Sequence, residues 1–199
     1  RLSQVRPAYM QAIIAYNKTL GKPVYPDANS TLRITYGTVD GYPAKDGVYK
    51  TPFTSVKGMI AKRQHAYPFS LPQNLVDAYQ SGKTAGYFYA DLAAKPEQSW
   101  LCRIAGCTEP AVTAFNSVPV NFLSSADTTG GNSGSPTLNG KAELVGLLFD
   151  GVIEGIIGNW DYDPATNRSI HVDSRYMLWQ MEKVDGATNL IKEMEIVKE

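Results

Sequence analysis

The stretch that decides the fold is Asp127-Thr128-Thr129-Gly130-Gly131-Asn132-Ser133-Gly134-Ser135-Pro136. A serine nucleophile must project from a tight turn, and backbone N–H groups must converge on the oxyanion that forms during attack. Gly131 lets the backbone approach a ligand without a Cβ, so the N–H groups of Gly131 and Ser133 are expected to form an oxyanion hole. Gly134 leaves room for a substrate. The stretch therefore predicts Ser133 as a nucleophile.

The residues after Ser133 separate two classes of serine hydrolase. The nucleophile elbow of α/β-hydrolases needs glycine two residues after the serine, where this chain has Ser135. The pattern G-x-S-G-S-P instead resembles the nucleophile loop of chymotrypsin-fold peptidases, with a strand before the loop and a hairpin after it. The alternative interpretation is a glycine-rich hairpin loop without chemistry.

Outward from this loop, periodicity predicts mostly β-structure between two helical ends. Leu32, Ile34 and Tyr36 alternate as in a half-buried strand. The turn signal Asn139-Gly140 predicts a hairpin that leads into a strand over 142–149. Further strands are expected near 118–122 and 169–173, and helices over 3–20, 73–80, 174–184 and 186–197. A partly closed antiparallel barrel fits this order.

Composition argues against several classes of partner. Lys+Arg and Asp+Glu balance at 19 each, which gives no electrostatic reason to expect nucleic acid or an anionic membrane. No apolar run approaches the roughly 20 residues that span a bilayer. No metal or cofactor site is expected.

The two cysteines, Cys102 and Cys107, are too few for a structural zinc site, which normally has four ligands. A small disulfide loop in an oxidising compartment is predicted, with two free thiols as the alternative. The start at Arg1 is neither an initiator methionine nor a signal peptide. We therefore expect the chain to begin inside a longer protein or after processing.

A serine nucleophile needs a general base, and the sequence offers no clear candidate for one. The chain has two histidines, His65 and His171. His65 lies in a charged stretch without the sequence context of a catalytic histidine, and His171 follows the serine on a predicted strand. A surface or structural role is favoured for both, so the catalytic His and Asp are expected upstream of Arg1 and the isolated chain is expected to be inactive.

Several motifs together resemble the bacterial dipeptidyl-peptidase 7 and 11 family of serine exopeptidases. They are Ala28 to Gly37, Gly41-Tyr42, Asp46-Gly47-Val48, Asp127 to Pro136, Leu148 to Gly151, Val172 to Tyr176 and Gly186-Ala187-Thr188. The resemblance implies a double β-barrel with a large helical domain inserted into it, which limits cleavage to dipeptides from a free N-terminus. Residues 1–25 would end the helical domain, 26–182 would form the C-terminal barrel and 183–199 a terminal helix, while the segment 91–117 matches no pattern of the family.

The same resemblance assigns substrate-binding residues. Asp150 matches the acidic residue that binds the substrate's α-ammonium; a simple turn at Asp150-Gly151 is the alternative. Gly151 stands where the acid-specific branch carries an arginine, so the chain resembles the branch that prefers a bulky apolar residue before the scissile bond. Asp127 lies six residues before Ser133, where trypsin-like enzymes place the floor of the specificity pocket. That analogy would predict basic substrates, and we weigh it below the Gly151 match.

The partners implied are oligopeptide substrates and the upstream half of the same polypeptide, and a homodimer of the full-length protein is a further candidate. The expected location is the periplasm or the cell surface of a bacterium, or secretion from it. Two rival functions stay open: an endopeptidase of the same fold, and a non-catalytic peptide-binding barrel. Asp150 discriminates between the exopeptidase and the endopeptidase, because an endopeptidase gains nothing from an ammonium anchor.

Overall fold

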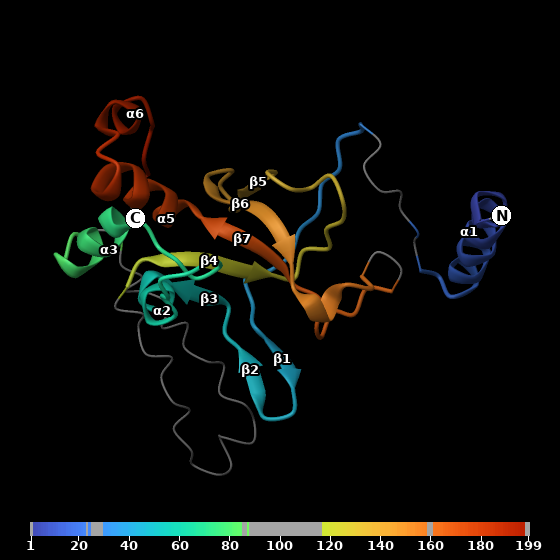
Figure 1. Cartoon of the computed structure of the whole chain (residues 1–199). Coiled ribbons are helices and arrows are strands. Elements are labelled where there is room, and N and C mark those ends of the chain that lie inside the picture. Colours follow the sequence, from blue (N-terminus) through green and yellow to red (C-terminus); the bar gives the residue numbers. More distant parts are fainter. Residues whose placement is uncertain are drawn as a thin grey trace, which may run out of the picture.

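The structure is a computed structural model that describes residues 2–22, 24, 30–84, 87, 117–158 and 161–197. The predicted disulfide between Cys102 and Cys107, and almost all of segment 91–117, lie outside the described residues. Figure 1 shows one central sheet, a small hairpin below it, helices gathered at one end of the sheet and the N-terminal helix α1 (Leu2–Thr19) standing apart.

The central sheet is antiparallel and has the strand order β3-β4-β7-β6-β5. Its strands are β3 (Phe53–Ser55), β4 (Pro119–Ser124), β5 (Pro136–Leu138), β6 (Leu144–Gly151) and β7 (Ser169–Asp173). The strands β1 (Tyr42–Lys45) and β2 (Val48–Lys50) form the separate hairpin. The predicted strands near 118–122, 142–149 and 169–173 are thus confirmed, with shifts of up to two residues at their ends.

The centre of the sheet follows the alternation read in the sequence. β7 buries Ser169, His171 and Asp173 and leaves the residues between them half-buried, as period-two side chains on one covered face do. Phe122 of β4 is also buried and stacks on the imidazole of His171, with 4.7 Å between ring centroids and 7° between planes.

Two expectations about the β-structure need correction. The sheet is open: within the described residues its strands do not close into a barrel. The predicted strand at 31–36 is irregular chain, and its apolar side chains Leu32, Ile34 and Tyr36 are 84–92% exposed. Pairing begins only beyond it, where the N–H of Ser125 donates to the carbonyl of Thr38, the N–H of Thr38 donates to the hydroxyl of Ser125, and Val39 bridges Ser124. Alternation requires a neighbouring strand to become a sheet, and none lies against this segment in the described part of the chain.

The helices form the main apolar core at the β4 end of the sheet (Figure 1). Those that contribute side chains to it are α2 (Val56–Ala61), α3 (Gln73–Gln80), α5 (Ser174–Trp179) and the π-helical turn η2 (Gln180–Val184). The helix α6 (Thr188–Lys192) follows η2 and has no buried residue. Trp179 is fully buried in this core, and its indole N–H donates to the carbonyl of Lys83. Helix 73–80 is as predicted, whereas the helix expected over 186–197 is only five residues long.

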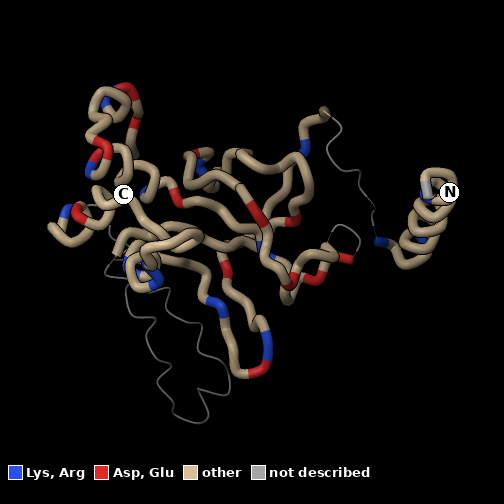
Figure 2. Tube along the Cα trace, in the orientation of Figure 1, with Lys and Arg blue, Asp and Glu red and all other residues tan. Residues whose placement is uncertain are grey.

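Charge is spread evenly over this framework. Figure 2 shows Lys and Arg interspersed with Asp and Glu along the described trace. Among the helices that the structure describes, none is long and apolar enough to cross a bilayer.

Candidate active site

The loop that carries Ser133 leads from β4 to β5 and is built as two tight turns. The N–H of Asn132 donates to the carbonyl of Thr129 at 3.2 Å, and the N–H of Ser135 donates to the carbonyl of Asn132 at 2.9 Å. The amide Oδ1 of Asn132 accepts from the N–H of Thr129 at 3.1 Å. Gly131 and Gly134 have φ of 90° and 84°, a region that favours glycine. These glycines allow Ser133 to sit exposed at the tip between the two turns.

The two predicted oxyanion donors are available to a ligand. The hydrogen bonds of the loop use the N–H groups of Thr129, Asn132, Gly134 and Ser135. In the part of the chain that the structure describes, no acceptor is bonded to the N–H of Gly131 or of Ser133. A pair of exposed, unpaired N–H groups beside a serine hydroxyl is what stabilisation of a tetrahedral oxyanion requires.

Neither histidine serves Ser133 as a base. The imidazole of His171 is buried, with Nε2 lying 2.7 Å from the hydroxyl of Ser124 and Nδ1 lying 2.7 Å from the hydroxyl of Thr137. Burial lowers the pKa of His171 to about 4. His65 is exposed on the loop after α2, and no described hydrogen bond joins it to Ser133. The predicted structural role of His171 is thus confirmed, and among the described residues neither histidine is hydrogen-bonded to Ser133.

The nucleophile loop is attached to the strand that carries Asp150. The N–H of Gly134 donates to the carbonyl of Leu148 at 2.6 Å, and the N–H of Leu148 donates to the carbonyl of Ser135 at 3.0 Å. Ser133 therefore lies beside β6, close to the point two residues before Asp150. The strands β5 and β6 fix this register through the pairs Pro136–Leu147 and Thr137–Gly146.

The end of β6 is shaped to present side chains. Its register with β7 shifts between Leu148 and Asp150, and from Phe149 onward all three residues of the strand are exposed. Irregularities of this kind re-aim side chains next to active sites. One oxygen of Asp150, Oδ1, accepts the N–H of Gly151 at 2.8 Å, and no described cation pairs with this carboxylate. Asp150 is thus an exposed anion held at a fixed place beside the nucleophile loop.

Gly151 faces open space. A Cβ built on it would meet no atom closer than the carbonyl of Arg168, at 3.7 Å. The guanidinium of Arg168 does not fill that space, because it is buried and donates to the carbonyls of Gly41, Pro164 and Asn167. The position after Asp150 therefore offers room for a side chain and no arginine of its own strand or of β7.

Asp127 follows β4, so it lies on the side of β7 opposite to β6 and Gly151. Gly151 pairs with Ser169, whose hydroxyl donates to the carbonyl of Ala126 at 2.8 Å and lies 2.6 Å from the hydroxyl of Thr128. Asp127 is half-buried between those two residues. Its charge contributes, after burial, to the raised pKa of Tyr162. Asp127 and Gly151 therefore flank Ser169, and no described contact joins them into one pocket.

Two groups of residues around this site were missed by reasoning from the sequence. Arg33 donates from Nη2 to the carbonyl of Gly130 at 3.2 Å, whereas the sequence pattern had assigned Arg33 no role at this site. Glu154, in the 3-10 turn η1 (Ile153–Gly155) after Gly151, binds Tyr42 and Lys50 of the hairpin. The sequence signals were the arginine between Leu32 and Ile34, and a glutamate close to Asp150.

The chain is similar in sequence and in structure to several known dipeptidyl-peptidases. It is 52% identical over 198 residues to a protein of Shewanella putrefaciens named Asp/Glu-specific dipeptidyl-peptidase, which covers all of this chain and 27% of that protein. It is 37% identical over 178 residues to dipeptidyl-peptidase 7 of Phocaeicola vulgatus, over 89% of this chain and 21% of that protein. The crystal structure of Porphyromonas endodontalis DPP11 in complex with the dipeptide Arg-Asp superimposes with a TM-score of 0.72 at 32% identity, over 91% of this chain and 23% of that one.

These matches confirm the resemblance read from the motifs. The chain spans about a quarter of the length of these relatives. The model of one protein family, Peptidase S46, matches residues 1–196, which is nearly the whole chain. The exposed serine loop, its two unpaired N–H groups and the neighbouring acid therefore occur in a chain that belongs to peptidase family S46.

Proposed function

We propose that this chain carries the nucleophile and the substrate anchor of a serine dipeptidyl peptidase. The observation that carries the proposal is the hydrogen bond from Gly134 to Leu148, which joins the residue after Ser133 to β6 at a point two residues before Asp150. Two residues of an extended strand rise about 7 Å. An extended dipeptide spans about 7 Å as well. A substrate ammonium on Asp150 would bring the carbonyl of the second residue to Ser133.

The reaction follows from these positions. The Oγ of Ser133 attacks the carbonyl carbon of the second substrate residue, and its proton passes to a general base from outside the described residues. The N–H groups of Gly131 and Ser133 hold the oxyanion. The base returns the proton to the leaving amine as the C–N bond breaks, and water then hydrolyses the ester to release the dipeptide.

The ammonium anchor favours an exopeptidase over an endopeptidase. A carboxylate that accepts hydrogen bonds from an ammonium ion makes a strong, short interaction at a fixed distance. Asp150 is exposed and, among the described residues, pairs with no cation. The backbone nitrogen inside a peptide chain is a neutral amide, so free N-termini are the substrates whose backbone gains from this carboxylate.

For the second substrate residue, the open space at Gly151 supports a bulky apolar side chain. Such a side chain gains about 25 cal/mol for each Å² of apolar surface it buries. An acidic side chain would lose hydration there without an ion partner, because the guanidinium of Arg168 is already bonded to three carbonyls.

A second candidate specificity comes from the relatives. The Shewanella putrefaciens protein, 52% identical to this chain, is named Asp/Glu-specific, as is a Flavobacterium psychrophilum relative at 38% identity. Asp or Glu before the scissile bond is therefore the alternative preference, and it would need a cation from outside the described residues.

The proposal also covers the domain architecture of the complete polypeptide. We take the open sheet as part of the second barrel of a chymotrypsin-like double barrel, completed by other segments of the polypeptide. Helix α1 would then close a helical domain over the cleft, with boundaries near residues 25 and 182. The sheet order and the isolated position of α1 support this arrangement (Figure 1).

The decisive experiment uses the complete polypeptide that contains this chain. Ser133→Ala should abolish hydrolysis of dipeptidyl reporter substrates, since removal of a triad nucleophile costs on the order of 10⁶ in turnover. Ser135→Ala is the matched control, because Ser135 is half-buried and should give a milder effect. Retained activity in Ser133→Ala would end the assignment.

A further inference from the structure

The peptide that joins Gly130 to Gly131 needs an external support. One of its ends is the carbonyl of Gly130 and the other is the N–H of Gly131, the predicted oxyanion donor. Because a trans peptide is planar, these two groups point in opposite directions. Glycine on both sides removes the Cβ atoms that normally hinder rotation of a peptide plane. This peptide could therefore turn over, which would put a carbonyl oxygen where the donor should be.

Arg33 provides that support. Its Nη2 donates to the carbonyl of Gly130 at 3.2 Å, across 97 residues of sequence. Arg33 is half-buried, whereas the side chains of Leu32 and Ile34 on either side of it are 90% and 84% exposed. The segment thus turns its charged residue toward the nucleophile loop and its apolar residues away from it.

The segment that carries Arg33 is itself fixed to the sheet. The N–H of Ser125 donates to the carbonyl of Thr38 at 2.9 Å, and the N–H of Thr38 donates to the hydroxyl of Ser125 at 3.0 Å. Gly37 lies so close to this strand end that a Cβ there would clash with the backbone N of Ala126. The segment from which Arg33 reaches the loop is therefore anchored to the chain just before Asp127.

We propose that Arg33 is a positioning residue for the oxyanion hole: its bond to the carbonyl of Gly130 holds the N–H of Gly131 toward the substrate. Its charge also polarises that peptide and strengthens the donor as negative charge develops on the substrate oxygen. This inference rests on the proposed function, and it assigns a role to the motif at 28–37 that the nucleophile and the anchor leave unexplained.

The test measures kcat and KM of the complete polypeptide with a dipeptidyl reporter. Arg33→Met should lower kcat about 10- to 100-fold, less than the 10²–10³ found when an oxyanion donor is removed outright. KM should stay within about twofold, because the interaction gains strength only in the transition state. Arg33→Lys, which keeps a cation, should recover part of the loss.

A second readout separates positioning from a merely structural role. A dipeptide boronic acid forms a tetrahedral adduct with the serine and places an oxygen in the oxyanion hole, so its affinity should fall by the same factor as kcat. A dipeptide analogue whose second carbonyl is reduced to a methylene group has no such oxygen, and its affinity should not change. The matched control is Arg63→Met, because Arg63 donates to Gln73 on α3, outside the nucleophile loop.

Three outcomes would overturn the inference: wild-type kcat in Arg33→Met, equal losses in Arg33→Met and Arg63→Met, or unchanged affinity for the boronic acid. If Arg33→Met does not fold, Arg33→Gln takes its place, since it keeps a polar side chain and removes the charge. Ser133→Ala distinguishes a failure of the proposed function from a failure of the role assigned to Arg33. Activity in that variant would refute the proposed function, whereas an inactive Ser133→Ala with a fully active Arg33→Met would refute only the role of Arg33.

Discussion

The hydroxyl of Tyr42 donates a hydrogen bond of 2.7 Å to Oε2 of Glu154, although 112 residues separate them in sequence. Lys50 adds an ion pair to the same carboxylate, with 2.9 Å between Nζ and Oε1. The hydrogen bonds from Tyr42 and Lys50 lower the pKa of Glu154 to about 2. This contact joins the β1–β2 hairpin to the turn that follows Asp150 and Gly151.

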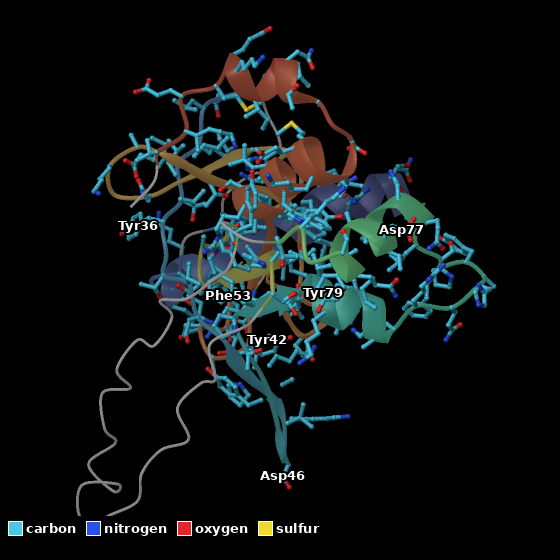
Figure 3. The ribbon with its side chains drawn as sticks, turned by 90° about the vertical axis from the view of Figure 1, so that its left-hand side faces the viewer. Tyr36, Tyr42, Asp46, Phe53, Asp77 and Tyr79 are labelled. Atoms are coloured by element: carbon cyan, nitrogen blue, oxygen red, sulfur yellow. The ribbon has the colours of Figure 1, made fainter. Side chains whose placement is uncertain are left out.

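Removal of the Tyr42 hydroxyl should destabilise the protein. Tyr42 is fully buried, and Tyr42→Phe removes one of the two residues that donate to the ionised Glu154 carboxylate, which we expect to cost about 1.5–3 kcal/mol in the free energy of unfolding. Urea denaturation measures the loss. Tyr36→Phe is the matched control, because Tyr36 is 92% exposed and lies at the margin of the molecule (Figure 3). Equal effects of the two substitutions would contradict the assigned contact.

Stability should fall in mild acid because of His171. Burial lowers its pKa to about 4 from an ordinary value of 6.5, so the unfolded chain binds the proton first. The contribution is complete above pH 6.5 and is lost as the pH falls toward 4, with a slope that approaches about 1.4 kcal/mol per pH unit. Over this window the loss should be on the order of 2–3 kcal/mol.

Denaturant unfolding at pH 7 and pH 5 tests this dependence. The difference between the two free energies should shrink in His171→Gln, which removes the titrating group, although that variant will be less stable at both pH values. His65→Gln is the control, since His65 is the other histidine of the chain and its side chain is exposed. An unchanged pH dependence in His171→Gln would show that other groups cause it.

The anchor role of Asp150 predicts a change confined to free N-termini. In the complete polypeptide, Asp150→Asn should lose about 1.5–3 kcal/mol in kcat/KM, the scale of a hydrogen bond to a charged group. That loss corresponds to roughly 10- to 150-fold. Asp46→Asn should be neutral, because Asp46 lies at the tip of the β1–β2 hairpin (Figure 3). Equal cleavage of acetylated and free peptides by the wild type would refute the exopeptidase proposal.

Gly151 allows a direct test of specificity. Its surroundings have room for a side chain, so Gly151→Arg should fold and should shift the preference toward Asp and Glu as the second substrate residue. A panel of dipeptidyl reporters that varies only this residue measures the shift, and the wild type should favour Leu, Met, Phe or Tyr. Gly140→Arg adds the same charge in the β5–β6 turn and should leave the profile unchanged. A wild type that prefers Asp or Glu would support the alternative drawn from the relatives, and one that prefers Lys or Arg would restore the trypsin-like role of Asp127.

Local sequence was sufficient to predict a tight, glycine-containing loop at Ser133 and several elements around it. The glycines around Ser133 are needed for positive φ, and they adopt it at Gly131 and Gly134. Helix 73–80 has the predicted bounds and strand 169–173 the predicted alternation, because a residue's neighbours in sequence fix the period of its side chains.

The tertiary structure alone decided which side of an alternating segment is covered. Leu32, Ile34 and Tyr36 show strand-like alternation, yet they are exposed, and Arg33 between them reaches Gly130. Periodicity cannot reveal this outcome, because the covering surface comes from residues far away along the chain. The same reason hid the pair of Tyr42 and Glu154, since the path of the backbone between them, rather than any local pattern, brings a donor to that carboxylate.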